Sequence, residues 1–91
     1  MDITTLTISL PNAAGLHARP CHAIVATALE YECELRIRFD GRDVDGKSIL
    51  ELMTLAAPQG SNLELVARGA DSGVCMERLE ALIRSGFGES S

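Results

Sequence analysis

The segment CELRIRFDGRDV, residues 33–44, decides the fold of this chain. Its apolar and charged residues alternate one by one as far as Phe39, which is the period of a half-buried β-strand. Asp40 and Gly41 follow at once, and an Asp-Gly pair between two strand-like runs is a strong signal for a tight hairpin turn. The sequence therefore predicts a β-hairpin with a short return strand over residues 42–44.

The flanking sequence switches between strand-like and helix-like patterns. Apolar residues recur at every second position in residues 5–10 and 63–68, which predicts two further strands. Spacings of three and four residues predict three helices, which begin near Ala18, after Ser48 and after Asp71 or Ser72. The residues expected on the buried stripes of the first and third helices are Cys21, Ile24, Val25, Ala28, Leu29, Cys75, Leu79, Leu82 and Ile83.

The predicted order of elements is β-α-β-β-α-β-α. The chain has 91 residues, enough for one small domain and too few for two, so residues 1–91 are expected to form a single domain. The third helical pattern stops at Gly86, which leaves residues 87–91 as a frayed tail. Because the strands are joined by a hairpin or separated by helices, we expect a mixed or antiparallel sheet with helices on one face, an α+β fold.

Composition and charge exclude several classes of function. The net charge of −5 disfavours nucleic acid as a partner, because phosphate backbones require clustered Lys and Arg. The sequence has no apolar run long enough to span a membrane. Its N-terminus is acidic and lacks the basic segment of a secretory signal. We therefore expect a soluble cytoplasmic protein.

The three cysteines, Cys21, Cys33 and Cys75, are widely spaced and form no CxxC pair. This pattern disfavours a disulfide framework or a zinc site and favours buried free thiols. His17, Cys21 and His22 could be taken as a metal cluster or as a thiol nucleophile with its base. Cys21 falls on a buried helical stripe and His22 lies off that stripe, so neither function is favoured. We predict no metal site.

The residues GLHARP at positions 15–20 place His17 at the start of the first helix. Helix N-termini attract anions through unpaired amides and the macrodipole. A neutral imidazole there could accept a phosphoryl group, with the backbone amides of Ala18 and Arg19 and the Arg19 guanidinium balancing its charge. Pro20 fits the first turn of the helix, where its missing N–H is not needed. The alternative is a capping histidine beside a solvated arginine.

Ser48 and the short helix after it form a second candidate region. Ser48 is either only an N-cap or a site of regulatory phosphorylation. The helix is apolar nearly all round, so we expect some of its residues to be exposed unless it is covered more deeply. Leu52 and Leu55 are predicted to face the sheet, and the residues left for an exposed contact patch are Ile49, Leu50 and Met53.

Two motifs in this sequence resemble the signatures of the HPr family, the histidine-containing phosphocarriers of the bacterial phosphotransferase system. GLHARP, residues 15–20, resembles the active-site signature, and GKSIL with LMTL, residues 46–55, resembles the signature around the regulatory serine. The separation of the two motifs and the predicted order of elements also match the family over residues 3–88. The resemblance implies an open-faced β-sandwich, in which a four-stranded antiparallel sheet carries three helices on one face.

The resemblance also implies a function and partners. His17 would accept a phosphoryl group on Nδ1 from phosphorylated Enzyme I, with phosphoenolpyruvate as the original donor, and pass it to an enzyme IIA domain. Arg19 would steady the phosphoryl group, and Ser48 would be the site of an HPr kinase/phosphorylase. The residues implied in partner docking are Lys47, Ile49, Leu50 and Met53. The protein would be a monomeric carrier without a cofactor and not an enzyme.

Three features depart from the family pattern. Cys21 and His22 replace a pair that is commonly small, and Glu51 stands where a small residue is common. The first helix has no basic residue after Arg19. These departures leave open an alternative: a regulatory binding module of the same fold, in a nitrogen-type or truncated phosphotransferase system without sugar uptake.

Overall fold

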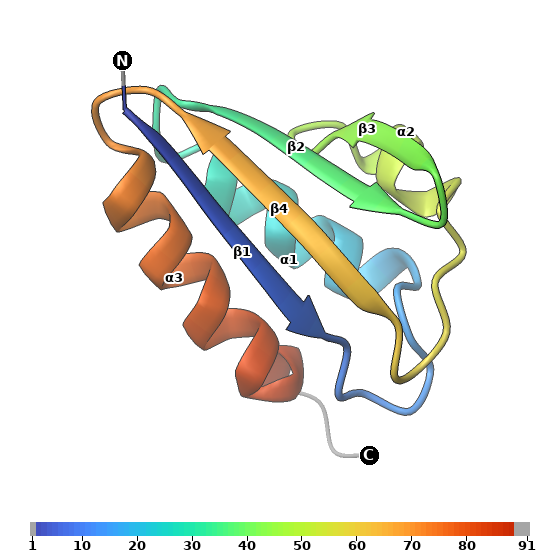
Figure 1. Ribbon diagram of the computed structural model, residues 1–91. Helices are drawn as coiled ribbons and strands as arrows, with labels where there is room; N and C mark the ends of the chain where they lie inside the picture. The colour runs from blue at the N-terminus through green and yellow to red at the C-terminus, as the bar shows by residue number, and fades with distance from the viewer. Residues whose placement is uncertain (1, 89–91) are drawn as a thin grey trace.

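The computed structural model describes residues 2–88 and contains one sheet with its helices on one side (Figure 1). The elements in chain order are β1 (Ile3–Ser9), α1 (Ala18–Ala28), β2 (Glu34–Phe39), β3 (Arg42–Asp45), α2 (Ile49–Met53), β4 (Asn62–Arg68), α3 (Ser72–Arg84) and the 3₁₀ turn η1 (Gly86–Gly88). This order is the predicted one. None of the helices in the described residues is long and apolar enough to cross a membrane.

The sheet is antiparallel throughout, with the strand order β1-β4-β2-β3. Ile37 lies opposite Leu65 of β4 on one side and Val44 of β3 on the other, so the hairpin sits at one edge of the sheet. The helices lie behind the sheet and leave its front face uncovered (Figure 1). This arrangement confirms the α+β, open-faced sandwich expected from the sequence.

The hairpin turn has the backbone that its sequence predicts. Asp40 and Gly41 both have positive φ, 52° and 78°, as a type I′ turn requires. On the strand before this turn, Leu35 and Ile37 are buried at 1% and 0% exposure, while the charged residues that alternate with them are exposed or half-buried on the open side. The alternation in the sequence therefore correctly predicts which face of β2 packs against the helices.

Most of the predicted helical stripes are buried. In α3, Cys75, Leu79 and Ile83 are buried as predicted, whereas Leu82 is only partly buried. Cys21, Ile24, Val25 and Ala28 of α1 are all buried. Leu29 was expected to extend this stripe, but 63% of its surface is exposed. Because α1 ends at Ala28 and Leu29 is its C-cap, this side chain lies beyond the last packed turn.

The expected frayed tail is wrong at its first residues. Phe87 is only 7% exposed and belongs to the hydrophobic core. Gly86, just after the C-cap Ser85, has φ 71°, the left-handed conformation that commonly ends helices. The chain turns back there and returns Phe87 to the core. The rest of the predicted tail, residues 89–91, lies outside the described residues.

Of the two predicted N-cap candidates, Asp71 and Ser72, Asp71 is the N-cap residue of α3, but its side chain does not cap that helix. Its carboxylate instead accepts hydrogen bonds from the backbone amides of Glu32, at 2.8 Å, and Cys33, at 3.0 Å. These bonds fasten the start of β2 to the start of α3. They also lower the pKa of Asp71, the bond from the Glu32 amide contributing most.

We expect this carboxylate to make stability depend on pH. A folded pKa below the unfolded one means that the ionised form stabilises the fold above the unfolded pKa, and that this contribution is lost as pH falls through the folded pKa. Asp71→Asn should therefore lower the urea midpoint at about pH 6, and its effect should shrink as the pH falls below the unfolded pKa of about 3.9. Urea unfolding of both proteins across this range tests the expectation. A difference that stays constant with pH would contradict it.

Candidate functional site

His17 occupies the N-cap position of α1. Its backbone is extended, with φ −88° and ψ −173°, and its carbonyl accepts the first helical hydrogen bond from the Cys21 amide at 3.1 Å. The half-buried side chain makes no hydrogen bond that caps the helix. The structure therefore places the imidazole at the helix mouth, as the sequence predicts, without giving it the capping role of the alternative.

A tight turn before His17 fixes where the helix begins. Gly15 has φ 68°, and its amide donates to the Asn12 carbonyl at 3.1 Å. The buried Asn12 side chain donates back to the Gly15 carbonyl through Nδ2 at 2.6 Å. Asn12 was not among the predicted site residues. The tendency of asparagine to bond to a nearby backbone group was the signal in the sequence that could have predicted this turn.

The same turn rests on the segment that follows α2. The Leu16 amide donates to the carbonyl of Ala57 at 2.8 Å. A Cβ placed on Gly15 would lie 2.3 Å from that carbonyl oxygen and 2.9 Å from the Cα of Pro58, closer than real Cβ atoms come. The histidine loop and the chain after α2 are therefore in direct backbone contact, which makes Gly15 necessary at its position.

The helix mouth combines two backbone donors with one arginine. The amides of Ala18 and Arg19 lie in the first turn, where no intrahelical acceptor is available, and Pro20 has no amide to add. The Arg19 side chain is exposed, and no ion pair joins it to another residue within 2–88. Its guanidinium is therefore available to an incoming anion.

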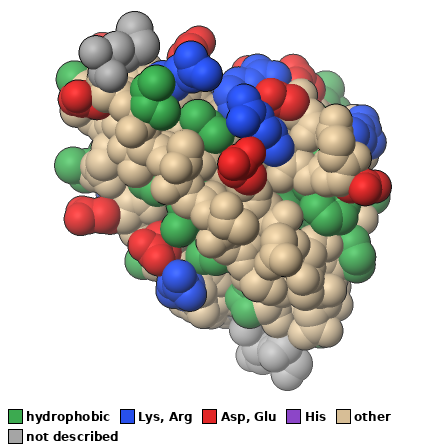
Figure 2. Space-filling view, viewed as in Figure 1, with side chains coloured by type: hydrophobic (Ala, Val, Ile, Leu, Met, Phe, Trp, Pro, Cys, Tyr) green, Lys and Arg blue, Asp and Glu red, His purple; other side chains and the backbone are tan. Residues whose placement is uncertain are grey.

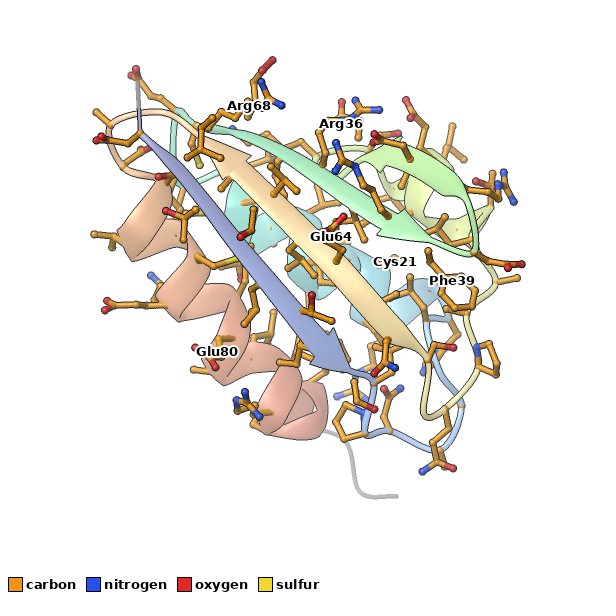
Figure 3. The ribbon with its side chains drawn as sticks, in the orientation of Figure 1. Cys21, Arg36, Phe39, Glu64, Arg68 and Glu80 are labelled. Carbon is orange, nitrogen blue, oxygen red and sulfur yellow. The ribbon has the colours of Figure 1, made fainter. Side chains whose placement is uncertain are left out.

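Cys21 and His22 do not form a reactive pair. Cys21 is fully buried, its thiol donates to the Leu16 carbonyl at 3.7 Å, and burial raises its pKa to about 11. His22 is exposed. Figure 3 shows Cys21 behind the sheet. Within the described residues, no group of three or more His, Cys, Asp or Glu side chains could hold a metal ion.

Ser48 is the N-cap of α2, as predicted. Its Oγ accepts a hydrogen bond from the Glu51 amide at 3.2 Å. The Glu51 carboxylate accepts in turn from the Asp45 amide at 3.0 Å. The Glu51 carboxylate thus belongs to the capping network of Ser48, and the Asp45 carboxylate accepts from the amide of Lys47, the residue before Ser48.

The exposed side of α2 carries two large apolar residues beside the charged Glu51. Leu50 is 81% and Met53 44% exposed, whereas Leu52 is completely buried. Leu55 is also buried, so the division of these residues between core and surface is as predicted. Ile49 is the intermediate case, since it is partly buried and packs against the core. We call Ile49, Leu50 and Met53 the apolar patch.

Lys47, expected near the docking surface, is engaged within the chain. Its ammonium donates to the Tyr31 carbonyl at 2.7 Å, just after α1. Its backbone amide donates to the Asp45 carboxylate at 2.9 Å. Lys47 therefore holds the turn before α2 against the end of α1.

The open face of the sheet carries most of the charged side chains near β2 and β3. Figure 2 shows positive and negative groups intermingled there, and no histidine is visible from this side. Arg36 and Arg38 both pair with Asp43, at 2.9 and 3.0 Å, and Arg38 also reaches Glu64 at 3.3 Å. Figure 3 shows Arg36 and Glu64 on this face. Because these arginines are paired with acids, the face is not a uniformly basic surface.

Known proteins match this chain over nearly its full length. The family described as "PTS HPr component phosphorylation site" matches residues 4–85. Phosphocarrier protein HPr of Neisseria meningitidis is 40% identical over 82 residues, which cover 90% of this chain and 92% of that protein. The HPr of Pseudomonas aeruginosa is 40% identical over 88 residues, covering 92% of this chain and 94% of its own.

The fold matches solved members of the same family. The crystal structure of HPr-C-His from Thermoanaerobacter tengcongensis superposes with a TM-score of 0.92 at 36% identity, covering 97% of this chain and 99% of that one. Sequence and fold thus agree over the same residues, and these residues include both predicted motifs. The chain belongs to the HPr family, the phosphocarrier proteins of the phosphotransferase system.

Proposed function

We propose that this chain carries a phosphoryl group on Nδ1 of His17, which it receives from phosphorylated Enzyme I and delivers to an enzyme IIA domain. One observation carries the proposal: His17 caps α1 through its extended backbone, and its side chain is not used in the capping. His17 directly precedes the amides of Ala18 and Arg19 in the first turn of α1, and a negatively charged group at a helix N-terminus is stabilised.

For this transfer the chain supplies the attacking nitrogen, its position and the charges that stabilise the phosphoryl group. The lone pair on Nδ1 forms a bond to phosphorus while the bond between phosphorus and the donor atom breaks, and the donor keeps that electron pair. Nδ1 must carry a free lone pair to form this bond, so the single proton of the neutral imidazole must lie on Nε2. The reverse step delivers the group to the next protein. The chain is itself phosphorylated and regenerated in each cycle, so it acts as a carrier and not as an enzyme.

Incubation with Enzyme I and phosphoenolpyruvate tests the proposal. The product should carry one phosphoryl group per chain, and the bond should be labile in acid and stable in base. Peptide mapping should place the group on residue 17 and not on the exposed His22. Failure to form this adduct with an Enzyme I that phosphorylates another HPr would reject the proposal.

Arg19→Ala should slow phosphoryl transfer without preventing it. Charge-assisted hydrogen bonds contribute more than neutral ones, so loss of the guanidinium should reduce the rate roughly ten- to a hundredfold. Arg19→Lys keeps the charge but not the planar fork, and its rate should lie between the two. Rapid-quench measurement of the adduct gives these rates. Equal rates for all three proteins would show that Arg19 does not contribute to phosphoryl transfer.

The apolar patch supports a docking role for α2. Leu50 and Met53 are exposed on a helix whose following segment contacts the histidine loop through Ala57. A partner covering this patch would therefore reach both the patch and His17. Ile49, the partly buried member of the patch, and Lys47, which is also bound to the segment after α1, complete the proposed docking surface.

A regulatory role at Ser48 is the second candidate, favoured by the position of this residue beside the apolar patch. A phosphate added by an HPr kinase/phosphorylase would bring negative charge next to Glu51, whose amide donates to the Ser48 side chain, and near Asp45, whose carboxylate accepts from the amide of Lys47. Repulsion there would disturb the start of α2, and the charge would border a surface that a partner must desolvate. Ser48 could thus control docking without touching His17.

Ser48→Asp should therefore slow phosphorylation by Enzyme I by about tenfold, since it adds a like charge at the same place. Ser48→Ala is the matched control, because it removes the capping oxygen without adding charge and costs about 1 kcal/mol of stability. The initial rate of His17 phosphorylation is the measurement for both variants. If Ser48→Asp abolished partner binding while His17→Ala had no effect, the regulatory module would replace the carrier.

A further inference from the structure

Two polar side chains are buried in the part of the chain that the structure describes: Asn12, at 2% exposure, and Ser72, at 1%. Burying a polar side chain costs free energy unless it is hydrogen-bonded. The Ser72 hydroxyl, at the start of α3, shares a hydrogen bond of 2.9 Å with that of Thr4. Asn12 lies instead in the loop between β1 and α1, five residues before His17 (Figure 1). Its contacts therefore bear on the proposed phosphoryl site.

Asn12 binds both polar groups of the Gly15 backbone. Its side-chain Nδ2 donates to the Gly15 carbonyl at 2.6 Å, and its own carbonyl accepts from the Gly15 amide at 3.1 Å. These two bonds close the turn in which Gly15 takes the left-handed conformation, with φ 68°. Asn12 therefore orients the peptide group that joins Gly15 to Leu16.

The same Gly15 carbonyl also binds the backbone of His17, whose amide donates to it at 3.0 Å. On its other side, the His17 carbonyl accepts from the Cys21 amide at 3.1 Å and begins α1. One of the two bonds that hold the His17 backbone thus shares its acceptor with Asn12. Since the direction of a side chain follows from its backbone, the position of the Gly15 carbonyl influences where the imidazole lies.

The two donors to the Gly15 carbonyl also matter for charge. A carbonyl oxygen has two lone pairs, and the Asn12 side chain and the His17 amide supply one donor each. Without Asn12, this oxygen would keep partial negative charge that is not offset, 3.0 Å from the His17 amide nitrogen. Negative charge there opposes the arrival of a phosphoryl group at His17. The Asn12 amide reduces this repulsion.

A second contact holds the same peptide group from its other side. The Leu16 amide, which belongs to the peptide group of the Gly15 carbonyl, donates to the carbonyl of Ala57 at 2.8 Å. A peptide group is planar, so bonds at both of its ends fix its orientation. Loss of the Asn12 side chain would leave the bond to Ala57 in place and free the carbonyl end. The two contacts therefore have separate roles in the histidine loop.

We propose that Asn12 is a positioning residue for phosphoryl transfer, which acts on His17 through the Gly15 carbonyl. The inference rests on the proposed function of His17. Asn12 forms no bond to phosphorus; its side chain fixes the peptide group that orients the accepting residue. An asparagine supplies the donor that this role requires, whereas an aspartate would place a carboxylate oxygen against the Gly15 carbonyl. A displacement of about 1 Å in a reacting group costs on the order of a hundredfold in rate.

Single-turnover transfer from phosphorylated Enzyme I, followed by rapid quench at several concentrations of the chain, tests this role. Asn12→Ala should lower the maximal rate roughly ten- to a hundredfold. The half-saturating concentration should stay the same, because the apolar patch on α2 is not altered. Leu50→Ala is the contrast and should mainly raise the half-saturating concentration, since it removes a docking contact. Asn12→Asp should lower the maximal rate at least as much as Asn12→Ala.

Ser72→Ala is the matched control, because it also removes the hydrogen bond of a buried polar side chain. Both alanine variants should lower the melting temperature by about 5–15 °C, but only Asn12→Ala should slow transfer. Hydrogen exchange of the His17 amide, measured by NMR without a partner, should be faster in Asn12→Ala and unchanged in Ser72→Ala. Asn12→Ser and Asn12→Asp repeat both measurements if Asn12→Ala does not fold.

The role of Asn12 is overturned if Asn12→Ala transfers at the maximal rate of the unmodified chain or if only its half-saturating concentration rises. It is also overturned if Ser72→Ala slows transfer equally, or if exchange of the His17 amide does not change in Asn12→Ala. Absence of the phosphoryl adduct in the unmodified chain would instead reject the proposed function of His17. The two failures are therefore distinguishable.

Discussion

Replacing His17 by alanine should abolish phosphorylation by Enzyme I and leave the fold intact. The imidazole supplies the nitrogen that bonds to phosphorus, and no neighbouring side chain can replace it, since Cys21 is buried and His22 is a separate, exposed residue. The His17 side chain makes no capping hydrogen bond and is only half-buried. We therefore expect His17→Ala to change the free energy of unfolding by less than about 1 kcal/mol.

His22→Ala is the matched control for this result. The chain has only these two histidines, so the pair of variants distinguishes the proposed site from the only other imidazole. His22→Ala should form the acid-labile adduct at the rate of the unmodified chain. Circular dichroism and urea unfolding establish that both variants fold. If the adduct persisted in His17→Ala, the phosphoryl group would have to be assigned to another residue.

Replacing Gly15 by alanine should give the largest loss of stability among the single changes considered. The new methyl group would lie 2.3 Å from the Ala57 carbonyl oxygen, and this oxygen accepts the Leu16 amide. Moving it away would weaken that hydrogen bond, and an L-residue at φ 68° is strained as well. Strain, crowding and the weakened bond together should cost about 3–5 kcal/mol. Urea unfolding measures this cost.

Gly60→Ala separates the steric part of this cost from the backbone part. Gly60 also has positive φ, 85°, but a Cβ there would meet nothing within 4 Å. It should therefore cost only about 1–2 kcal/mol. Gly15→Ala should also slow the phosphorylation of His17, because the turn that begins α1 must shift. Equal losses of stability for the two variants would mean that the histidine loop is not held against Ala57.

Much of the candidate site was visible in the sequence because it depends on neighbouring residues. Pro20 in the first turn of a helix and a serine before an apolar run are local signals, and the structure places His17 and Ser48 at the two N-caps they predict. The contact between Gly15 and Ala57 was not visible, because these residues are far apart in the sequence. Neither Asn12 nor Ala57 carries the kind of side chain that suggests chemistry.

Phe87 and Leu29 show the same limit for the core. Both are large apolar residues at the end of a helical pattern, yet Phe87 is buried and Leu29 is exposed. Their local sequences do not tell them apart. The difference arises because the chain after Gly86 folds back onto the core, whereas Leu29 caps a helix that ends at the surface.

The sequence by itself determined the elements of this protein: the alternation of β2, the turn at Asp40 and Gly41, and the helix start at His17. Each depends on backbone preferences and side-chain spacings within a few residues. Only the tertiary structure decided the strand order β1-β4-β2-β3 and the contact of Gly15 with Ala57. These features join residues that are distant along the chain, so they depend on how all the apolar faces are buried together and not on any one segment.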